Sequence, residues 1–211
     1  EVEYNVAEWE PTISKSSSSI EISQDIKTFP MEPDEKIINK WYLRLGGNTP
    51  INLTIRAGAY DGNLDLSGIP LNNLDIRDGA SNSKIVFNLN NPIQMNTVRY
   101  KTGASNVEIL SIANANLDEL IFTGGAGKAI LDFSGQLDRD MYVEINGGVG
   151  SLQIIVPEGT HCILRDNGEL VNIFNRGGWT EDGSTYETEG SGPIIEIEAN
   201  LSVGSLELKI D

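Results

Sequence analysis

The sequence between residues 53 and 156 repeats five times, and each repeat is centred on a glycine. The five glycines follow one another at intervals of 21, 24, 22 and 23 residues: Gly58, Gly79, Gly103, Gly125 and Gly148. The positions five and three before each glycine are apolar or aromatic, as Leu53 and Ile55 are in the first repeat. The positions six and eight after it are apolar too, with Ser111 as the one exception. Repeats of roughly 20 to 50 residues are typical of solenoids, and the alternation on both flanks predicts two short strands that meet at a glycine corner.

We therefore predict an all-β fold, a single-domain right-handed parallel β-solenoid of about five coils of 21–24 residues with irregular end caps. The hand follows from the crossover preference of parallel strands. The expected organisation is an N-terminal irregular segment and cap over residues 1–40, regular coils over residues 41–159, and degenerate C-terminal coils with a cap over residues 160–211.

Two details of the repeats predict how the coils pack. The corner glycines are followed by small residues, as in Gly79-Ala80-Ser81-Asn82, which indicates tight corners with positive φ and close stacking. Four apolar residues in the connectors are expected to supply a third inward contact per coil: Leu71, Met95, Leu117 and Leu137.

The N-terminal residues outside the repeats give weaker signals. The serine run at residues 16–19 indicates a solvated loop, and the alternation at residues 20–22 indicates a short strand. Pro30 and Pro33 predict a break, after which residues 40–45 are expected to form a strand that leads into the first repeat.

The C-terminal residues carry a clearer signal. Residues 203–208 copy residues 149–154, so we expect a further, degenerate coil to cap the C-terminal end, because terminal coils must cover an open core. Trp9, Trp41 and Trp179 also lie outside the repeats. We expect them to cap the ends of the core, and an exposed ring that stacks on a sugar is the alternative.

Charge and composition exclude several classes of function. The chain has 211 residues, 31 of them acidic and 15 basic, and the net charge of −16 disfavours binding to nucleic acid or to an anionic membrane surface. Cys162 is the one cysteine, so no intrachain disulfide can form. No apolar stretch approaches a membrane span. The chain begins at Glu1 without an initiator methionine, so we expect that any signal or membrane anchor has been removed.

Two aspartates form the most suggestive pair for catalysis. Asp65 and Asp132 stand in near copies of one motif, Leu-Asp-Leu-Ser-Gly and Leu-Asp-Phe-Ser-Gly. Three coils separate them, which places them about 14 Å apart at about 4.8 Å per coil. A pair of glycosidase carboxylates lies roughly 5 to 9.5 Å apart, so we expect two independent, outward-facing aspartates.

A basic column and one ion pair are predicted on the strand surfaces. Arg56, Arg77 and Lys101 stand two positions before their glycines in three consecutive coils, where they could bind an anionic chain or pair with neighbouring carboxylates. Pairing is the expected use in so acidic a chain. Lys84 and Glu108 occupy equivalent positions of adjacent coils and are expected to pair across strands.

His161 and Cys162 suggest a nucleophile pair, but adjacent strand residues point to opposite faces. We expect one of the two to be buried and the other exposed. A single His and a single Cys also fall short of a zinc site. No catalytic, cofactor-binding or metal-binding residue is predicted, and no cofactor.

The C-terminal half resembles the toast-rack β-solenoid domains, which are related to the extracytoplasmic-type domains of bacterial cell-envelope stress regulators. The matching residues are Val156-Pro157 with the following Gly159, the turn at Asp182-Gly183-Ser184, and the closing Val203-Gly204-Ser205-Leu206-Glu207. With the repeats, the resemblance covers residues 40–211. It implies a bacterial domain of largely unknown function that is often tethered to a membrane, and it supplies no catalytic residue.

These observations predict a non-enzymatic scaffold or interaction module of the cell envelope or cell surface, in an extracytoplasmic location. The expected partner is an unidentified protein or envelope component, without nucleic acid and without direct membrane insertion of this chain. Unpaired strand edges at the solenoid ends make self-association through those ends possible. The alternative is a carbohydrate-binding or carbohydrate-cleaving β-helix, which an acid cluster in a groove or a bound calcium ion would favour.

Overall fold

The computed structural model describes residues 1–27 and 36–211, so the break predicted at Pro30 and Pro33 lies outside the described residues. The chain divides into two compact units, Glu1–Leu45 and Gly46–Asp211. Strands dominate both units, which confirms the predicted all-β class. Each unit is described below by itself.

The first unit consists of two antiparallel strand pairs and one turn of 3-10 helix, η1 (Ala7–Trp9). Strand β1 (Val2–Tyr4) pairs with β4 (Asn39–Trp41), and β2 (Thr12–Lys15) pairs with β3 (Ile20–Ser23). Strand β3 confirms the strand predicted at residues 20–22, and the serine run forms the turn before it.

The strand predicted over residues 40–45 is wrong beyond Trp41, where β4 ends. Its partner β1 spans three residues only, and beyond Trp41 the pairing consists of two hydrogen bonds between Tyr42 and Glu1, at 2.8 and 2.9 Å. Trp9 is buried and Trp41 half-buried, and their expected role as caps of the solenoid stays a prediction.

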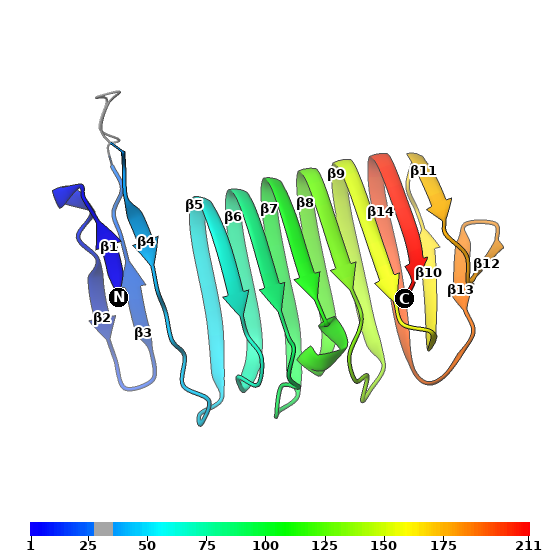
Figure 1. Cartoon of the computed structure of the whole chain (residues 1–211), viewed down its shortest axis with the longest axis horizontal. Coiled ribbons are helices and arrows are strands. Elements are labelled where there is room, and N and C mark those ends of the chain that lie inside the picture. The colour runs from blue at the N-terminus through cyan, green and yellow to red at the C-terminus, as the bar shows by residue number, and fades with distance from the viewer. Residues whose placement is uncertain (28–35) are drawn as a thin grey trace. The chain divides into compact units, whose positions relative to one another are not determined.

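The second unit is a stack of parallel coils, as predicted. Strands β5 (Ile51–Asp65), β6 (Leu71–Val86), β7 (Met95–Leu110), β8 (Leu117–Asp132) and β9 (Met141–Val156) pair side by side in chain order (Figure 1). Each strand runs through its corner glycine without a break and folds back on itself, which gives the coil a first arm before the glycine and a second arm after it. The register aligns equivalent repeat positions, for example Leu53 with Leu74 and Ile76 with Tyr100.

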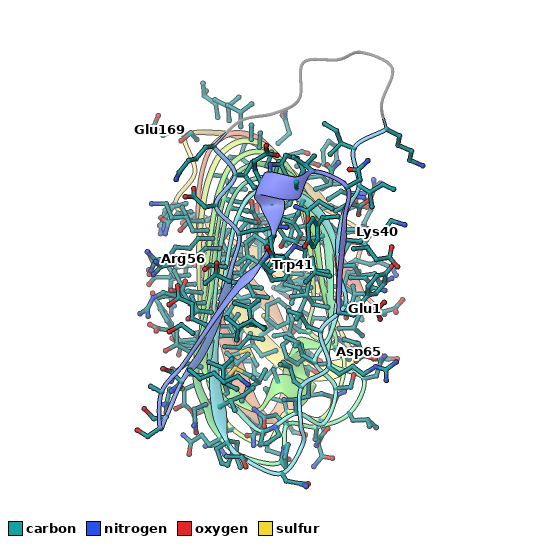
Figure 2. All side chains as sticks on the ribbon, turned by 90° about the vertical axis from the view of Figure 1, so that its left-hand side faces the viewer. Glu1, Lys40, Trp41, Arg56, Asp65 and Glu169 are labelled. Carbon is teal, nitrogen blue, oxygen red and sulfur yellow. The ribbon has the colours of Figure 1, made fainter. Side chains whose placement is uncertain are left out.

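The core lies between the two arms. Alternate side chains point inward and are buried, while the residues between them face outward, so that Arg56 and Asp65 project from opposite sides of the stack (Figure 2). Ser111, the exception in the repeat pattern, adopts a left-handed conformation with φ 58° and starts the 3-10 helix η2 (Ile112–Ala115). That helix places Ile112 in the core, so the coil keeps an apolar contact where the repeat position itself is polar.

The predicted third inward contact is confirmed in three of four coils. Leu71, Met95 and Leu117 are buried at the starts of β6, β7 and β8. In the next coil Met141, at the start of β9, is buried at the equivalent position, and Leu137 in the preceding loop is half-buried and packs against the core.

Four of the corner glycines, Gly79, Gly103, Gly125 and Gly148, are required by close approach, and the positive φ predicted at the corners is not the reason. None of the five has a φ in the left-handed region. A Cβ on Gly103 would lie 2.4 Å from the carbonyl oxygen of Gly79 in the preceding coil, and one on Gly148 would lie 2.3 Å from that of Gly125. The backbones of neighbouring corners therefore touch, and only glycine fits.

The place predicted for the last coil is wrong. Strand β14 (Gly190–Ile210) lies inside the stack, with β9 on one side and β10 (Gly159–Asp166) and β11 (Leu170–Asn175) on the other. Residues 203–208 pair in register with the residues 149–154 that they copy. The copied sequence therefore correctly indicated neighbouring coils, and the error came from assuming that coils stack in chain order.

The C-terminal end of the stack is formed by β10, β11 and a hairpin. Strand β12 (Trp179–Asp182) pairs with β13 (Thr185–Thr188), which pairs antiparallel with β10. Trp179 is buried in the core cluster there, as expected of a capping residue. The edge strands at this end, β12 and β11, are only four and six residues long, which leaves little backbone free to pair with another chain.

Candidate functional site

Asp65 and Asp132 are not partners. The register places Val86 and Leu110 between them, one in each intervening coil, as predicted. Both carboxylates instead hold the turn that follows their strand, since Asp65 Oδ1 accepts the Ser67 backbone N–H at 3.1 Å and Asp132 Oδ1 accepts that of Ser134 at 2.9 Å. The hydrogen bonds from Ser67 also hold the pKa of Asp65 below its ordinary value. The repeated Asp-x-Ser motif is thus a turn signal.

The basic column is in register, and its members differ in their pairing. Arg56 aligns with Arg77, and Arg77 aligns with Lys101. Arg77 donates from Nε and Nη2 to the two carboxylate oxygens of Asp75, at 3.1 and 3.0 Å. Within the part of the chain that the structure describes, Arg56 and Lys101 form no ion pair. The predicted pair of Lys84 and Glu108 is confirmed, at 3.6 Å.

His161 and Cys162 lie on opposite faces of β10, as predicted. Cys162 is buried, and burial raises the pKa of its thiol, which keeps it protonated and unreactive. His161 Nε2 lies 2.8 Å from Glu187 Oε1 on the outer surface. The two side chains therefore cannot act as a thiolate–imidazole pair.

A polar network that sequence reasoning missed lies inside the corner of β5, β6 and β7. At its centre, the Tyr100 hydroxyl lies 2.7 Å from the Ser83 hydroxyl and donates to Asp78 Oδ2 at 2.7 Å. The hydroxyls of Tyr60 and Ser81 each lie 3.2 Å from the Tyr100 hydroxyl oxygen. Tyr100 is 1 % exposed, and burial raises the pKa of its phenol.

The second carboxylate oxygen of Asp78 is used as well. Asp78 Oδ1 accepts a hydrogen bond from Thr102 Oγ1, and Ser105 Oγ lies 3.4 Å from the same Oδ1. The hydroxyls of Thr102 and Ser105 also contact each other. The Ser81 backbone N–H donates to Ser105 Oγ at 2.7 Å and ties the network to the corner itself. Because its polar atoms are occupied by one another, the arrangement fits a structural role and leaves no free nucleophile–base pair.

One signal in the sequence could have revealed this network. Ile76 points inward, so the period of two places Asp78 inward as well, and an inward aspartate needs partners. Its main partner, Tyr100, comes from the next coil. Tyr100 is the counterpart of Ile76 there and of Phe122 in the coil after it, so a polar hydroxyl stands in an otherwise apolar column.

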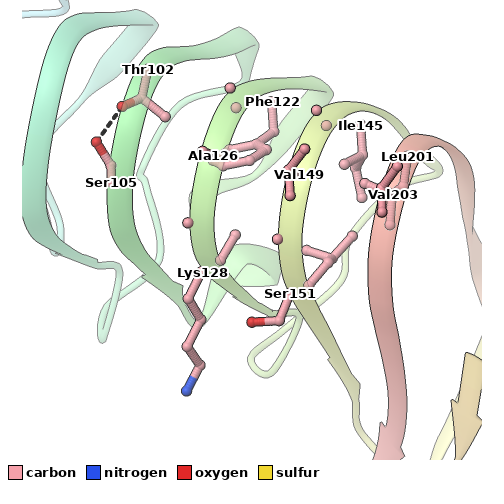
Figure 3. A pocket seen from close by; sticks show the side chains of 18 residues that line it. Thr102, Ser105, Phe122, Ala126, Lys128, Ile145, Val149, Ser151, Leu201 and Val203 are labelled. Carbon is pink, nitrogen blue, oxygen red and sulfur yellow. Dashed lines mark hydrogen bonds between the residues drawn. The ribbon is translucent and has the colours of Figure 1, made fainter. Parts of the chain in front are cut away.

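The same corner is hollow further along the stack. Over β8, β9 and β14, Gly124, Gly127 and Gly150 line a hollow of about 40 Å³ that Phe122 and Leu201 border from within (Figure 3). Binding pockets for small ligands usually measure roughly 300–1,000 Å³. This hollow is too small for such a ligand.

A larger, open trough lies on the outer surface of the second arm. It measures about 360 Å³, and Asp61, Asn82 and Asn106 line it in three successive coils, with Lys84 and Lys128 beside them. Most of its side chains are polar or charged, and each coil contributes more than one. Equivalent positions follow one another along the ladder of the sheet, as Asn82 and Asn106 do.

Among the described residues, no three His, Cys, Asp or Glu side chains are grouped so that they could hold a metal ion. The helices in this part of the chain are also too short and too polar to cross a membrane.

Comparison with known proteins decides the family. The family model described as "N-terminal domain of toast_rack, DUF2154" matches residues 1–110 and 82–155. The chain belongs to the toast-rack family. The matched residues include the whole first unit and the coils up to β9, so the toast-rack assignment rests largely on segments other than the C-terminal turns that suggested it.

A solved structure shares the fold. This is the crystal structure of a "putative cell adhesion protein" from Clostridium sporogenes, which is 20 % identical in sequence with a TM-score of 0.54. The match covers 99 % of the toast-rack chain and 80 % of the clostridial chain. None of the curated proteins matches the chain.

Proposed function

We propose that this toast-rack domain is a non-enzymatic scaffold or interaction module of the bacterial cell envelope or cell surface. The observation that carries the proposal is the arrangement of its polar groups. Outward side chains form ladders with one residue per coil, as in the column of Arg56, Arg77 and Lys101, and the inward Asp78 and Tyr100 are occupied by internal hydrogen bonds. A row of equivalent side chains across neighbouring coils suits contact with an extended partner that lies along the row.

Two further observations support an envelope or surface location. The fold neighbour from Clostridium sporogenes carries a name that refers to cell adhesion. The net charge of −16 would keep such a domain away from anionic lipid and nucleic acid, so its partner is expected to be a protein or a wall component.

Epitope accessibility tests the location in the native host. An epitope inserted at Gly183, in the turn between β12 and β13, should be tolerated because nothing lies within 4 Å of that position. We expect antibody labelling of intact cells or of spheroplasts, and recovery of the protein with the envelope fraction. A matched insertion at Ser17, in the turn between β2 and β3, controls for local masking. Labelling that requires lysis, with recovery in the cytosol, would contradict the proposal.

The trough on the second arm favours one alternative, a carbohydrate-binding surface. Its amide groups at Asn82 and Asn106 could hydrogen-bond sugar hydroxyls in two adjacent coils. Calorimetric titration with cell-wall oligosaccharides separates the readings. Saturable binding that Asn82→Ala with Asn106→Ala abolishes would favour the alternative, whereas the scaffold proposal expects no such binding.

A further inference from the structure

The outer surface of the first arms has opposite charges at its two ends. We call it the first-arm face; it consists of the outward residues between the start of each coil and its glycine corner. In β5, β6 and β7 it carries four basic residues and one acidic residue: Arg56, Arg77, Arg99, Lys101 and Asp75. In β8, β9 and β14 it carries four glutamates: Glu119, Glu144, Glu196 and Glu198.

The basic half is largely uncompensated. Arg77 binds Asp75, but Arg56, Arg99 and Lys101 are exposed and form no ion pair among residues 1–27 and 36–211. These cations stand out in a chain of net charge −16, and a surface that keeps them unpaired is suited to an acidic partner.

The acidic half is also mostly uncompensated. Glu196 lies 3.8 Å from Arg165 of β10, and Glu144 accepts a hydrogen bond from the Asn146 side chain at 2.8 Å. Tyr142 stands between these coils, and burial together with Glu198 and the other glutamates raises the pKa of its phenol. The potential over β8, β9 and β14 is therefore negative.

We propose that two copies of this chain associate through the first-arm face, with their stacks running in opposite directions. A twofold axis in the interface, parallel to the strands, reverses the stacking direction of the second copy. The basic half of each copy then faces the acidic half of the other, and the contact is self-complementary. A twofold axis along the stack would instead place like charges opposite each other. This inference does not depend on the proposed function.

The size of the face sets the strength of this association. Six coils at about 4.8 Å and five residues at about 3.3 Å give a flat area of roughly 29 by 17 Å, or about 500 Å² per partner. Stable dimers bury about 800 Å² per partner. The pair is therefore expected to be weak, in the micromolar range or above, and dependent on salt because the facing charges are exposed.

Sedimentation of the full 211-residue chain tests the association. We expect the mass to rise with concentration from 23.0 kDa toward that of two copies in 50 mM salt. At 500 mM salt the dissociation constant should rise at least about tenfold. A chain that remains a monomer up to millimolar concentration in 50 mM salt would overturn the proposal.

Charge reversal identifies the surface. The pair Arg99→Glu with Lys101→Glu removes the net positive charge of the basic half, and the pair Glu144→Lys with Glu198→Lys removes the net negative charge of the acidic half. Each variant alone should lose self-association, and an equimolar mixture should form a mixed pair, because the unaltered acidic half of the first variant then faces the unaltered basic half of the second. One complementary contact of the two in wild type remains, so the mixed pair should be weaker than wild type but tighter than either variant alone. Lys84→Glu with Lys128→Glu makes the same charge change on the second arm and should leave the association unaltered.

The remaining outcomes count against the proposal. Association that persists in both reversed variants assigns it to another surface, such as the solenoid ends. A mixture that fails to pair, with both variants folded by circular dichroism, rules out the antiparallel arrangement. If reversal impairs folding, Arg99→Gln with Lys101→Gln repeats the test, and it should weaken wild-type association without any gain on mixing.

Discussion

The coils β5–β7 and the coils β8, β9 and β14 build the same corner with different contents. In the first group the inward corner positions hold Asp78, Thr102 and Tyr60. Thr102 donates a hydrogen bond to Asp78, and the Tyr60 hydroxyl contacts that of Tyr100. In the second group the equivalent positions hold glycines such as Gly124 and Gly127, and the corner encloses a small hollow. The same backbone path at the corner is thus compatible with polar inward side chains in one group of coils and with glycine in the other.

The difference shows what the corner requires. Its demand on the backbone is the close approach of successive coils, which the glycines at residues 79, 103, 125 and 148 meet in both groups. The space beside them can be filled by a hydrogen-bonded network or left nearly empty under glycine. Ordering and desolvating the polar side chains of the network costs free energy. The network fixes a single arrangement of the core only if each of its polar groups has a hydrogen-bond partner.

The largest effect is expected from moving a residue of the first group into the second. Gly127→Ser introduces the residue that Ser105 supplies one coil earlier. Gly127 has a φ of +126°, and a Cβ there would lie 2.0 Å from the Ser105 carbonyl oxygen, so the variant should lose at least about 3 kcal/mol in urea unfolding. Gly58→Ser is the control, because nothing lies within 4 Å of its Cβ position and the loss should stay within about 0.5 kcal/mol. Equal losses in both variants would refute the close-approach argument.

The next effect tests the network. Tyr100→Phe removes the hydroxyl that Ser83 and Asp78 contact, and it leaves their oxygens without that partner. The free energy of unfolding should fall by about 1–3 kcal/mol. Tyr142→Phe, on the outer surface, should cost less than about 1 kcal/mol. A neutral Tyr100→Phe would show that the network is dispensable.

The network should also make stability depend on pH at the alkaline end. Burial raises the pKa of Tyr100, so the folded state keeps its proton where the unfolded tyrosine ionises, above about pH 10. The unfolded state then binds fewer protons, and stability falls by up to about 1.4 kcal/mol per pH unit for this group, while below pH 10 its contribution is complete.

Urea unfolding between pH 9 and 11 measures this slope. Tyr100→Phe should flatten it above about pH 10, and the residual slope comes from Cys162, Tyr60 and the other tyrosines whose pKa is raised. Cys162→Ala serves as the control, since burial also raises the pKa of that thiol and its loss begins one to two units lower. An unchanged slope in Tyr100→Phe would contradict the assignment.

The smallest effect is expected in the hollow. A Cβ on Gly124 would lie 3.1 Å from Cε1 of Phe122, a side chain that can shift by a few tenths of an ångström. Gly124→Ala also lowers the entropy of the unfolded chain, so the net change should stay within about 0.5 kcal/mol. A loss above about 2 kcal/mol would show that the hollow is as closely fitted as the network.

The periodic part of this architecture could be predicted from the sequence. Inward columns such as Leu53 and Leu74 follow from a period of two, and the repeat spacing fixes which residues align between coils. The position of β14 could not be derived, because a copied segment indicates a neighbour but not the side on which it stacks. The network at Tyr100 was missed because its members are far apart in sequence and each alone looks like a tolerated exception.

The position of β14 has a consequence for how the protein is made. Residues 195–210 pair with β9 on one side, and β10 and β11 pair with their other side. These residues follow β9, β10 and β11 in the chain, so those three strands wait in the nascent chain with open edges until β14 emerges. A chain that stops before Ile195 can complete neither half of this end, and its exposed edges are free to pair with other molecules.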